Sequence, residues 1–189
     1  MCVWSPHYKN VIIFSLYVYN YIPSACLGIR VNDTIIGDPL FTVPFQADHT
    51  SLCYEVHGKA AQTFNLVSDV CTSVNALYSE GSSDGINVIT EIGVLAVTEG
   101  TCHTIDIKLN CSYSVDDVIP LGNTVRMDGI YIRRNANRVR ISVPNCENVN
   151  LVMWVTCQTV SGQEMLRFDI SRGINLRPTS HGLIGKGSR

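Results

Sequence analysis

The stretch Arg138-Val-Arg-Ile-Ser-Val143 decides the fold class, because its three β-branched apolar residues alternate with two arginines and a serine. Such alternation places apolar side chains on one face of a strand and polar side chains on the other. Thr104-Ile-Asp-Ile-Lys-Leu109 repeats the pattern, with both isoleucines and Leu109 predicted on one face and Asp106 and Lys108 on the other. Both segments are therefore predicted to be strands of a sheet that has one buried face.

Similar segments recur along most of the chain. Further strands are predicted at residues 52–56, 63–67, 93–97, 129–133, 149–155 and 165–170. Turn-forming residues separate them, and no stretch of ten or more residues has a helical period. The predicted fold is all-β, a single antiparallel β-sandwich.

The composition fits one globular domain. Of the 189 residues, 46% are hydrophobic and 16% are charged, which suits a packed core and is unlike a disordered chain. The net charge of -2 provides no overall attraction to nucleic acids or anionic membranes. Nucleic acid is therefore not an expected partner, and binding to any polyanion must come from a local cluster of basic residues.

The eight cysteines indicate an oxidising compartment. None belongs to a C-x-x-C pair, and no zinc-ligand spacing is present, so no metal site is predicted. Scattered cysteines in a β-rich chain are typical of disulfides; buried free thiols in a cytosolic protein are the alternative, and the pairing stays open. The sequons at Asn32 and Asn110 predict glycosylation and agree with secretion.

The N-terminal hydrophobic segment, residues 1–28, resembles a secretory signal peptide. Lys9 precedes an apolar run over residues 11–19, and small residues follow near Cys26. The run is too short to span a membrane as a helix. An ordinary first strand, or a start outside the natural domain, is the alternative. Residues 29–189 form the predicted β domain.

Two features suggest catalysis, and both have a simpler explanation. Residues 81–85 match G-x-S-x-G, which serves as a nucleophile elbow only where a strand turns into a helix. The strand-like segment that follows Gly85 favours a hairpin tip, so Ser83 is not assigned as a nucleophile. His57 and His103 have no partner of recognisable spacing, and structural or solvent-exposed roles are predicted for them. No catalytic residue and no enzyme activity are predicted.

Arg133, Arg134, Arg138 and Arg140 cluster on a predicted hairpin. By alternation, Arg133, Arg138 and Arg140 share its outer face, where forked guanidinium donors suit the carboxylates or sulfates of a glycan. A solvated charged face is the alternative.

The dipeptide Asp38-Pro39 has latent chemistry. An aspartyl carboxylate can attack its own peptide carbonyl, and the tertiary amide nitrogen of proline is a better leaving group than an ordinary amide nitrogen. Cleavage leaves a transient anhydride on the aspartate, which a nearby hydroxyl can trap as an ester. Most Asp-Pro bonds never react in this way.

Several blocks occur in the same order as in the C-terminal region of the inter-alpha-trypsin inhibitor heavy chains, and this part of the chain resembles that region. The resemblance covers roughly residues 36 to 186 and depends on the ordered combination of blocks. They are Gly37-Asp-Pro-Leu-Phe-Thr-Val-Pro44, Leu52-Cys-Tyr-Glu-Val56, Phe64-Asn-Leu-Val-Ser-Asp69, Glu91-Ile-Gly-Val-Leu-Ala96, Asp128-Gly129-Ile130 with the basic hairpin, the strand over 149–155, and Thr179-Ser-His-Gly-Leu-Ile-Gly185.

The resemblance implies a role in hyaluronan metabolism and matrix linkage. In that family the bond within the G-D-P block is cut, and the new C-terminal aspartate is esterified to chondroitin sulfate and later transferred to hyaluronan. Asp38 would be the linking residue here, and Pro39 would begin a propeptide. A separate Kunitz-type chain carries protease inhibition in the family and is a further implied partner.

The sequence departs from the family at several points. Leu40 replaces the histidine that follows the proline, the upstream domains of the family are absent, and the chain stops at Arg189, so the domain is expected to be incomplete. These departures favour the alternative function, an extracellular interaction or glycan-binding module that is never cut. Both hypotheses place the protein outside the cell, and neither requires a cofactor.

Overall fold

The structure is a computed structural model, and it describes residues 11–12, 40–44, 51–55, 61–68, 71–80, 87–98, 100–144, 150–160 and 162–170. In these ranges every regular element is a β-strand. The predicted all-β class is therefore confirmed. Within the same ranges, no helix is long and apolar enough to cross a membrane.

The first sheet has the strand order β1-β4-β5-β6-β7-β8. Its strands are β1 (Val11–Ile12), β4 (Thr63–Ser68), β5 (Thr72–Glu80), β6 (Asn87–Thr98), β7 (Thr101–Lys108) and β8 (Tyr113–Val115). Neighbouring strands run antiparallel, except that the two-residue β1 pairs with β4 in parallel. Apart from residues 11–12, the predicted N-terminal segment 1–28 lies outside the described residues.

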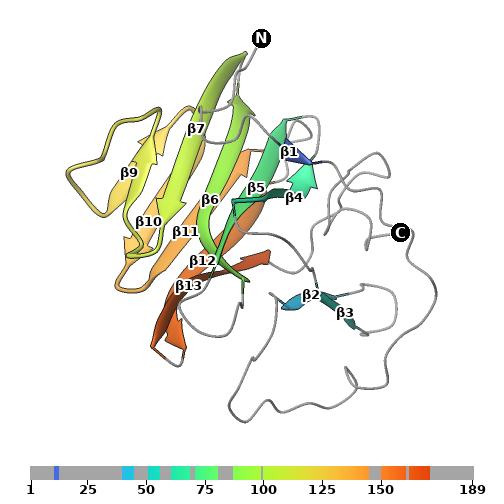
Figure 1. Ribbon diagram of the computed structural model, residues 1–189. Helices are drawn as coiled ribbons and strands as arrows, with labels where there is room; N and C mark the ends of the chain where they lie inside the picture. Colours follow the sequence, from blue (N-terminus) through green and yellow to red (C-terminus); the bar gives the residue numbers. More distant parts are fainter. Residues whose placement is uncertain are drawn as a thin grey trace.

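The second sheet has the order β13-β12-β11-β10-β9 and is antiparallel throughout. Its strands are β9 (Thr124–Met127), β10 (Ile130–Asn135), β11 (Arg138–Pro144), β12 (Asn150–Val160) and β13 (Gln163–Ile170). The remaining strands, β2 (Leu40–Pro44) and β3 (Ser51–Glu55), form a separate hairpin. Figure 1 shows the two larger sheets face to face, as the predicted sandwich requires.

One hydrophobic core fills the space between the two sheets. Ile92 and Ile107 contribute from the first sheet, and Ile132, Ile141 and Met153 contribute from the second, all fully buried. Burial of this many large apolar side chains is the main source of stability for such a sandwich. The alternation in β11 behaves as predicted: its apolar residues face the core and its arginines face away.

The strands that alternate strongly were predicted, whereas β2, β5, β8 and β9 were not. The sequence prediction missed β5, whose outward positions carry serine and asparagine, residue types with low strand propensity. It also missed β8 and β9, which have only three and four residues and are too short to show a period.

One prediction for β7 was incomplete. Asp106 lies opposite the core-facing isoleucines, as predicted, but its residue is only 7% exposed. Its neighbours across the sheet are Gly93 and then Asn75, which is also buried. The outer face of the first sheet is therefore not open to solvent along the row of Asp106, Gly93 and Asn75.

A disulfide between Cys111 and Cys157 joins the two sheets. Cys111 lies in the turn after β7, and Cys157 lies in β12. Cys71 and Cys102 are also disulfide-bonded, and no cysteine in the described ranges is free. The expectation of disulfides therefore agrees with the structure in this part of the chain.

Candidate functional site

The outward side of the second sheet carries a mixed array of arginines and aromatic rings. The strand register places these side chains on one face across β9, β10, β11 and β12. We call this surface the arginine–aromatic face, and it consists of Arg126, Tyr131, Arg133, Arg138, Arg140 and Trp154. The structure thus brings together the three arginines that alternation predicted on one face, and it adds Arg126 and two rings.

Three of the four guanidinium groups of this face lie over the rings. Arg138 lies over the Trp154 ring at 4.0 Å from the ring centroid to Cζ, and Arg126 lies over the Tyr131 ring at 5.2 Å. Arg140 contacts both rings, at 5.4 Å from Trp154 and 5.9 Å from Tyr131. Stacking of this kind fixes the plane of a guanidinium group without using its hydrogen-bond donors.

Arg140 is the arginine that lies near both rings. Its Nε atom is buried and has no hydrogen-bond partner. Its register neighbour in β10 is Arg133, which is exposed. Like charges directly opposite each other on adjacent strands are destabilising. A bound anion between Arg133 and Arg140 would remove this repulsion.

The charge on the outward side of the second sheet is strongly one-sided. Besides the four arginines of the arginine–aromatic face, β13 contributes Arg167 and Asp169, which pair with each other at 3.2 Å. No other acidic side chain lies on this side among the described strands. A chain with a net charge of -2 therefore presents a local basic surface.

Arg134, the fourth arginine of the predicted cluster, does not belong to this face. Its Nε donates to Asn123 Oδ1 at 3.3 Å, and its backbone N–H donates to the Asn123 carbonyl at 2.8 Å. Arg134 therefore holds the segment that precedes β9.

The chemistry available to the arginine–aromatic face is recognition of planar or tetrahedral anions. Guanidinium groups donate forked hydrogen bonds to carboxylates, sulfates and phosphates. The half-buried aromatic rings between them provide flat apolar surface on which sugar rings can pack. The face extends across four strands, which suits a chain-like ligand better than a small molecule enclosed in a pocket.

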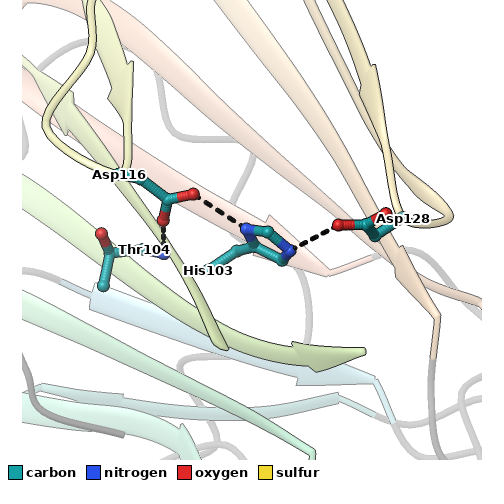
Figure 2. A network of polar contacts seen from close by, with 4 residues as sticks. All are labelled: His103, Thr104, Asp116 and Asp128. Carbon is teal, nitrogen blue, oxygen red and sulfur yellow. Dashed lines mark hydrogen bonds and ion pairs between the residues drawn. The ribbon is translucent and has the colours of Figure 1, made fainter. Parts of the chain in front are cut away.

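A second polar arrangement joins the two sheets at His103 (Figure 2). The His103 ring is buried; its Nδ1 lies 2.8 Å from Asp116 Oδ2 and its Nε2 lies 2.9 Å from Asp128 Oδ2. Asp116 follows β8, whereas Asp128 lies in the turn between β9 and β10. The other Asp116 oxygen accepts a hydrogen bond from the Thr104 backbone at 2.8 Å.

This network has a structural role. Ionised carboxylates only accept hydrogen bonds, so the His103 ring donates to both aspartates when both of its nitrogens carry a proton. A catalytic triad instead needs one ring nitrogen directed at a nucleophile. In the described arrangement both nitrogens of His103 face carboxylates. The predicted structural role agrees with this burial, and a solvent-exposed role for His103 is wrong.

The other predicted site residues are placed as follows. Asn110 is exposed in the turn after β7, and its Oδ1 accepts a hydrogen bond from the Ser112 backbone at 2.9 Å. Its glycosylation stays a prediction. The described ranges do not include Asn32, Asp38, Pro39, His57 or Ser83. Cleavage and glycan linkage at Asp38-Pro39 likewise stay predictions of the family resemblance.

The described ranges contain no group of three or more His, Cys, Asp or Glu side chains that could hold a metal ion.

The sequence prediction missed Trp154, Tyr131 and Arg126 as members of the arginine–aromatic face. Tyr131 precedes Arg133 by two residues, so alternation alone would have placed it there. Trp154 and Arg126 needed the register with β11 and β10.

Comparison with known proteins adds no further site residues, because no protein-family model matches the chain and no curated protein matches it.

Proposed function

We propose that this chain is an extracellular β-sandwich module that binds acidic matrix glycans, chondroitin sulfate or hyaluronan, through the arginine–aromatic face. The module acts by binding and not by catalysis. The observation that carries the proposal is the stacking of Arg126, Arg138 and Arg140 on Tyr131 and Trp154 across four strands.

Three features support an acidic glycan as the ligand. Stacking fixes the planes of the guanidinium groups without using their N–H donors. Apart from the buried Nε of Arg140, these donors favour forked hydrogen bonds to sulfate or carboxylate. The rings of Tyr131 and Trp154 add apolar surface for the sugar rings. The repulsion between Arg133 and Arg140, which are direct partners in the register, is relieved by an anion.

The disulfides support an extracellular location. The link between Cys111 and Cys157 and the bonded state of Cys71 and Cys102 are typical of proteins that fold in an oxidising compartment. The resemblance to the inter-alpha-trypsin inhibitor heavy chains, noted from the sequence, implies the same glycans. Reversible binding at the arginine–aromatic face does not require cleavage at Asp38-Pro39.

Affinity chromatography on immobilised chondroitin sulfate tests the proposal. Replacing Arg133, Arg138 and Arg140 by alanine should elute the chain at lower salt and reduce the salt dependence of retention, because fewer ionic contacts remain to be screened. Replacing the same three residues by lysine keeps the charge and should restore retention only in part.

The matched control is Lys108→Ala, which removes a positive charge from β7, a strand of the other sheet. It should leave retention unchanged. Equal retention of the triple-alanine variant and the unmodified chain would overturn the proposal and leave the arginines as a solvated face.

Immobilised hyaluronan, which carries carboxylates alone, should retain the chain more weakly than the sulfated glycan.

A further inference from the structure

The segment between β8 and β9 exposes three large apolar side chains. Val118 is 67% exposed, Ile119 is 74% exposed and Leu121 is 110% exposed, and they are the exposed large hydrophobic residues of the described ranges. We call residues 116–123 the apolar loop. It projects beside β9 at the edge of the sandwich (Figure 1). Clustered exposed apolar residues on a folded domain mark an interaction surface.

The apolar loop is held in place at both ends. The backbone N–H and C=O groups of Val115 and Val118 exchange two hydrogen bonds of 2.9 Å, with positive φ angles at Asp116 and Asp117, as in a tight hairpin turn. At the other end, the Arg134 backbone N–H donates to Asn123. A loop fixed in this way loses little conformational freedom when it binds.

Partly buried polar contacts anchor the base of the apolar loop. Asp116 is fixed by His103, and the Tyr113 hydroxyl donates to the Gly122 carbonyl at 3.3 Å. Among the residues that the structure describes, none buries the side chains of Ile119 and Leu121.

The charges beside the apolar loop indicate what kind of partner fits. Asp117 is exposed, and the carboxylates of Asp116 and Asp128 are 42% and 51% exposed. Arg134 adds a positive charge where it donates to Asn123, but these three carboxylates outnumber it. An anionic membrane surface would repel this acidic group. A complementary surface must combine apolar or aromatic area with positive charge.

The same chain carries such a surface, the arginine–aromatic face. Its rings, Tyr131 and Trp154, offer apolar area, and its arginines offer the opposite charge to the aspartates. We infer that the partner is a second copy of this chain, with the apolar loop of one molecule docked on the arginine–aromatic face of the next.

The two contacting surfaces differ, so the association is head-to-tail and can extend to a third molecule. The inference uses the arginine–aromatic face but does not rest on glycan binding. A glycan that occupies this face would compete with the docked loop.

Sedimentation velocity of the full chain, with its disulfides intact, over a range of protein concentrations tests the inference. The unmodified chain should show species that grow with concentration. Ile119→Asp and Leu121→Asp should each weaken association by about tenfold or more, because each places a charge at the centre of the contact. Both residues are exposed, so the variants should fold normally.

A charge exchange provides the sharper control. Asp117→Arg and Arg138→Asp should each weaken association, and the chain that carries both should recover it, because opposite charges again face each other between copies. Lys108→Glu, on the other sheet, should have no effect. A variant at Leu121 should keep its retention on chondroitin sulfate, so loss of self-association and loss of glycan binding can be told apart.

Three results would overturn the inference. One is a monomer at every concentration, and another is association that ignores Ile119→Asp and Leu121→Asp. The third is a monomer whose apolar loop instead binds vesicles of zwitterionic lipid, which would identify a lipid surface as the partner. Addition of soluble chondroitin sulfate should dissociate the head-to-tail species if both proposals hold.

Discussion

Replacement of His103 by leucine should destabilise the fold by about 3 kcal/mol. When both ring nitrogens carry a proton, the substitution removes two hydrogen bonds to carboxylates, at 2.8 and 2.9 Å, and each such bond contributes roughly 1.5–3 kcal/mol. The lower end of that range applies, because the side chains of Asp116 and Asp128 are 42% and 51% exposed and can be hydrated once the ring is gone. Urea unfolding with the disulfides intact measures the change.

Two further variants separate this network from simple loss of packing. Asp128→Ala removes one of the two bonds and should cost about 1.5 kcal/mol. In a double-mutant cycle, His103→Leu and Asp128→Ala should show a coupling energy of about 1.5 kcal/mol. Arg167→Ala is the control, because it breaks an exposed ion pair with Asp169 and should cost less than about 1 kcal/mol. The reasoning fails if Asp128→Ala is as harmless as this control, or if the coupling energy is near zero.

Three further predictions concern stability. Gly129→Ala should cost about 1–2 kcal/mol in thermal unfolding, because Gly129 has φ +78 and an added Cβ would lie 3.3 Å from Pro144 Cγ; an unchanged melting temperature would contradict this. Replacing Cys111 and Cys157 by alanine opens a cross-link between residues 46 positions apart and should lower the free energy of unfolding by about 4 kcal/mol, and a loss below about 1 kcal/mol would count against it. Burial raises the pKa of Tyr113 above its usual 10.0, an effect that Arg134 partly offsets, so the folded chain holds this proton more tightly than the unfolded chain does. The free energy of unfolding should therefore fall as the pH rises above about 10, and less steeply in Tyr113→Phe; identical pH profiles would refute the assignment.

Much of the sheet structure could be predicted from the sequence, because alternation is a local property. In β11 the apolar residues and the arginines alternate without interruption, and the structure buries the apolar set and places the arginines on the opposite face. The same local rule placed Arg133, Arg138 and Arg140 on one face. Short strands such as β8 and β9 gave no period to detect, and the polar residues of β5 concealed it.

The long-range arrangements could not be predicted in the same way. Trp154 reaches the arginine–aromatic face only because β12 pairs with β11 in a register that places it beside Arg140. His103 and its partners are separated by 13 and 25 residues and come from a strand and two turns. No local pattern in the sequence links a histidine to aspartates at such separations. The Asp116 contact depends on the pairing of β7 with β8, and the Asp128 contact depends on how the two sheets pack.

The measurement that tests glycan binding most directly is an NMR titration of the isotopically labelled chain with a chondroitin sulfate oligosaccharide. The Trp154 indole N–H and the Nε–H signals of Arg138 and Arg140 should shift together and saturate, because these groups lie in contact on one face. Backbone signals of β7, in the opposite sheet, should not move. Absence of shifts, or shifts centred on Lys108 and not on Trp154, would contradict binding at the arginine–aromatic face.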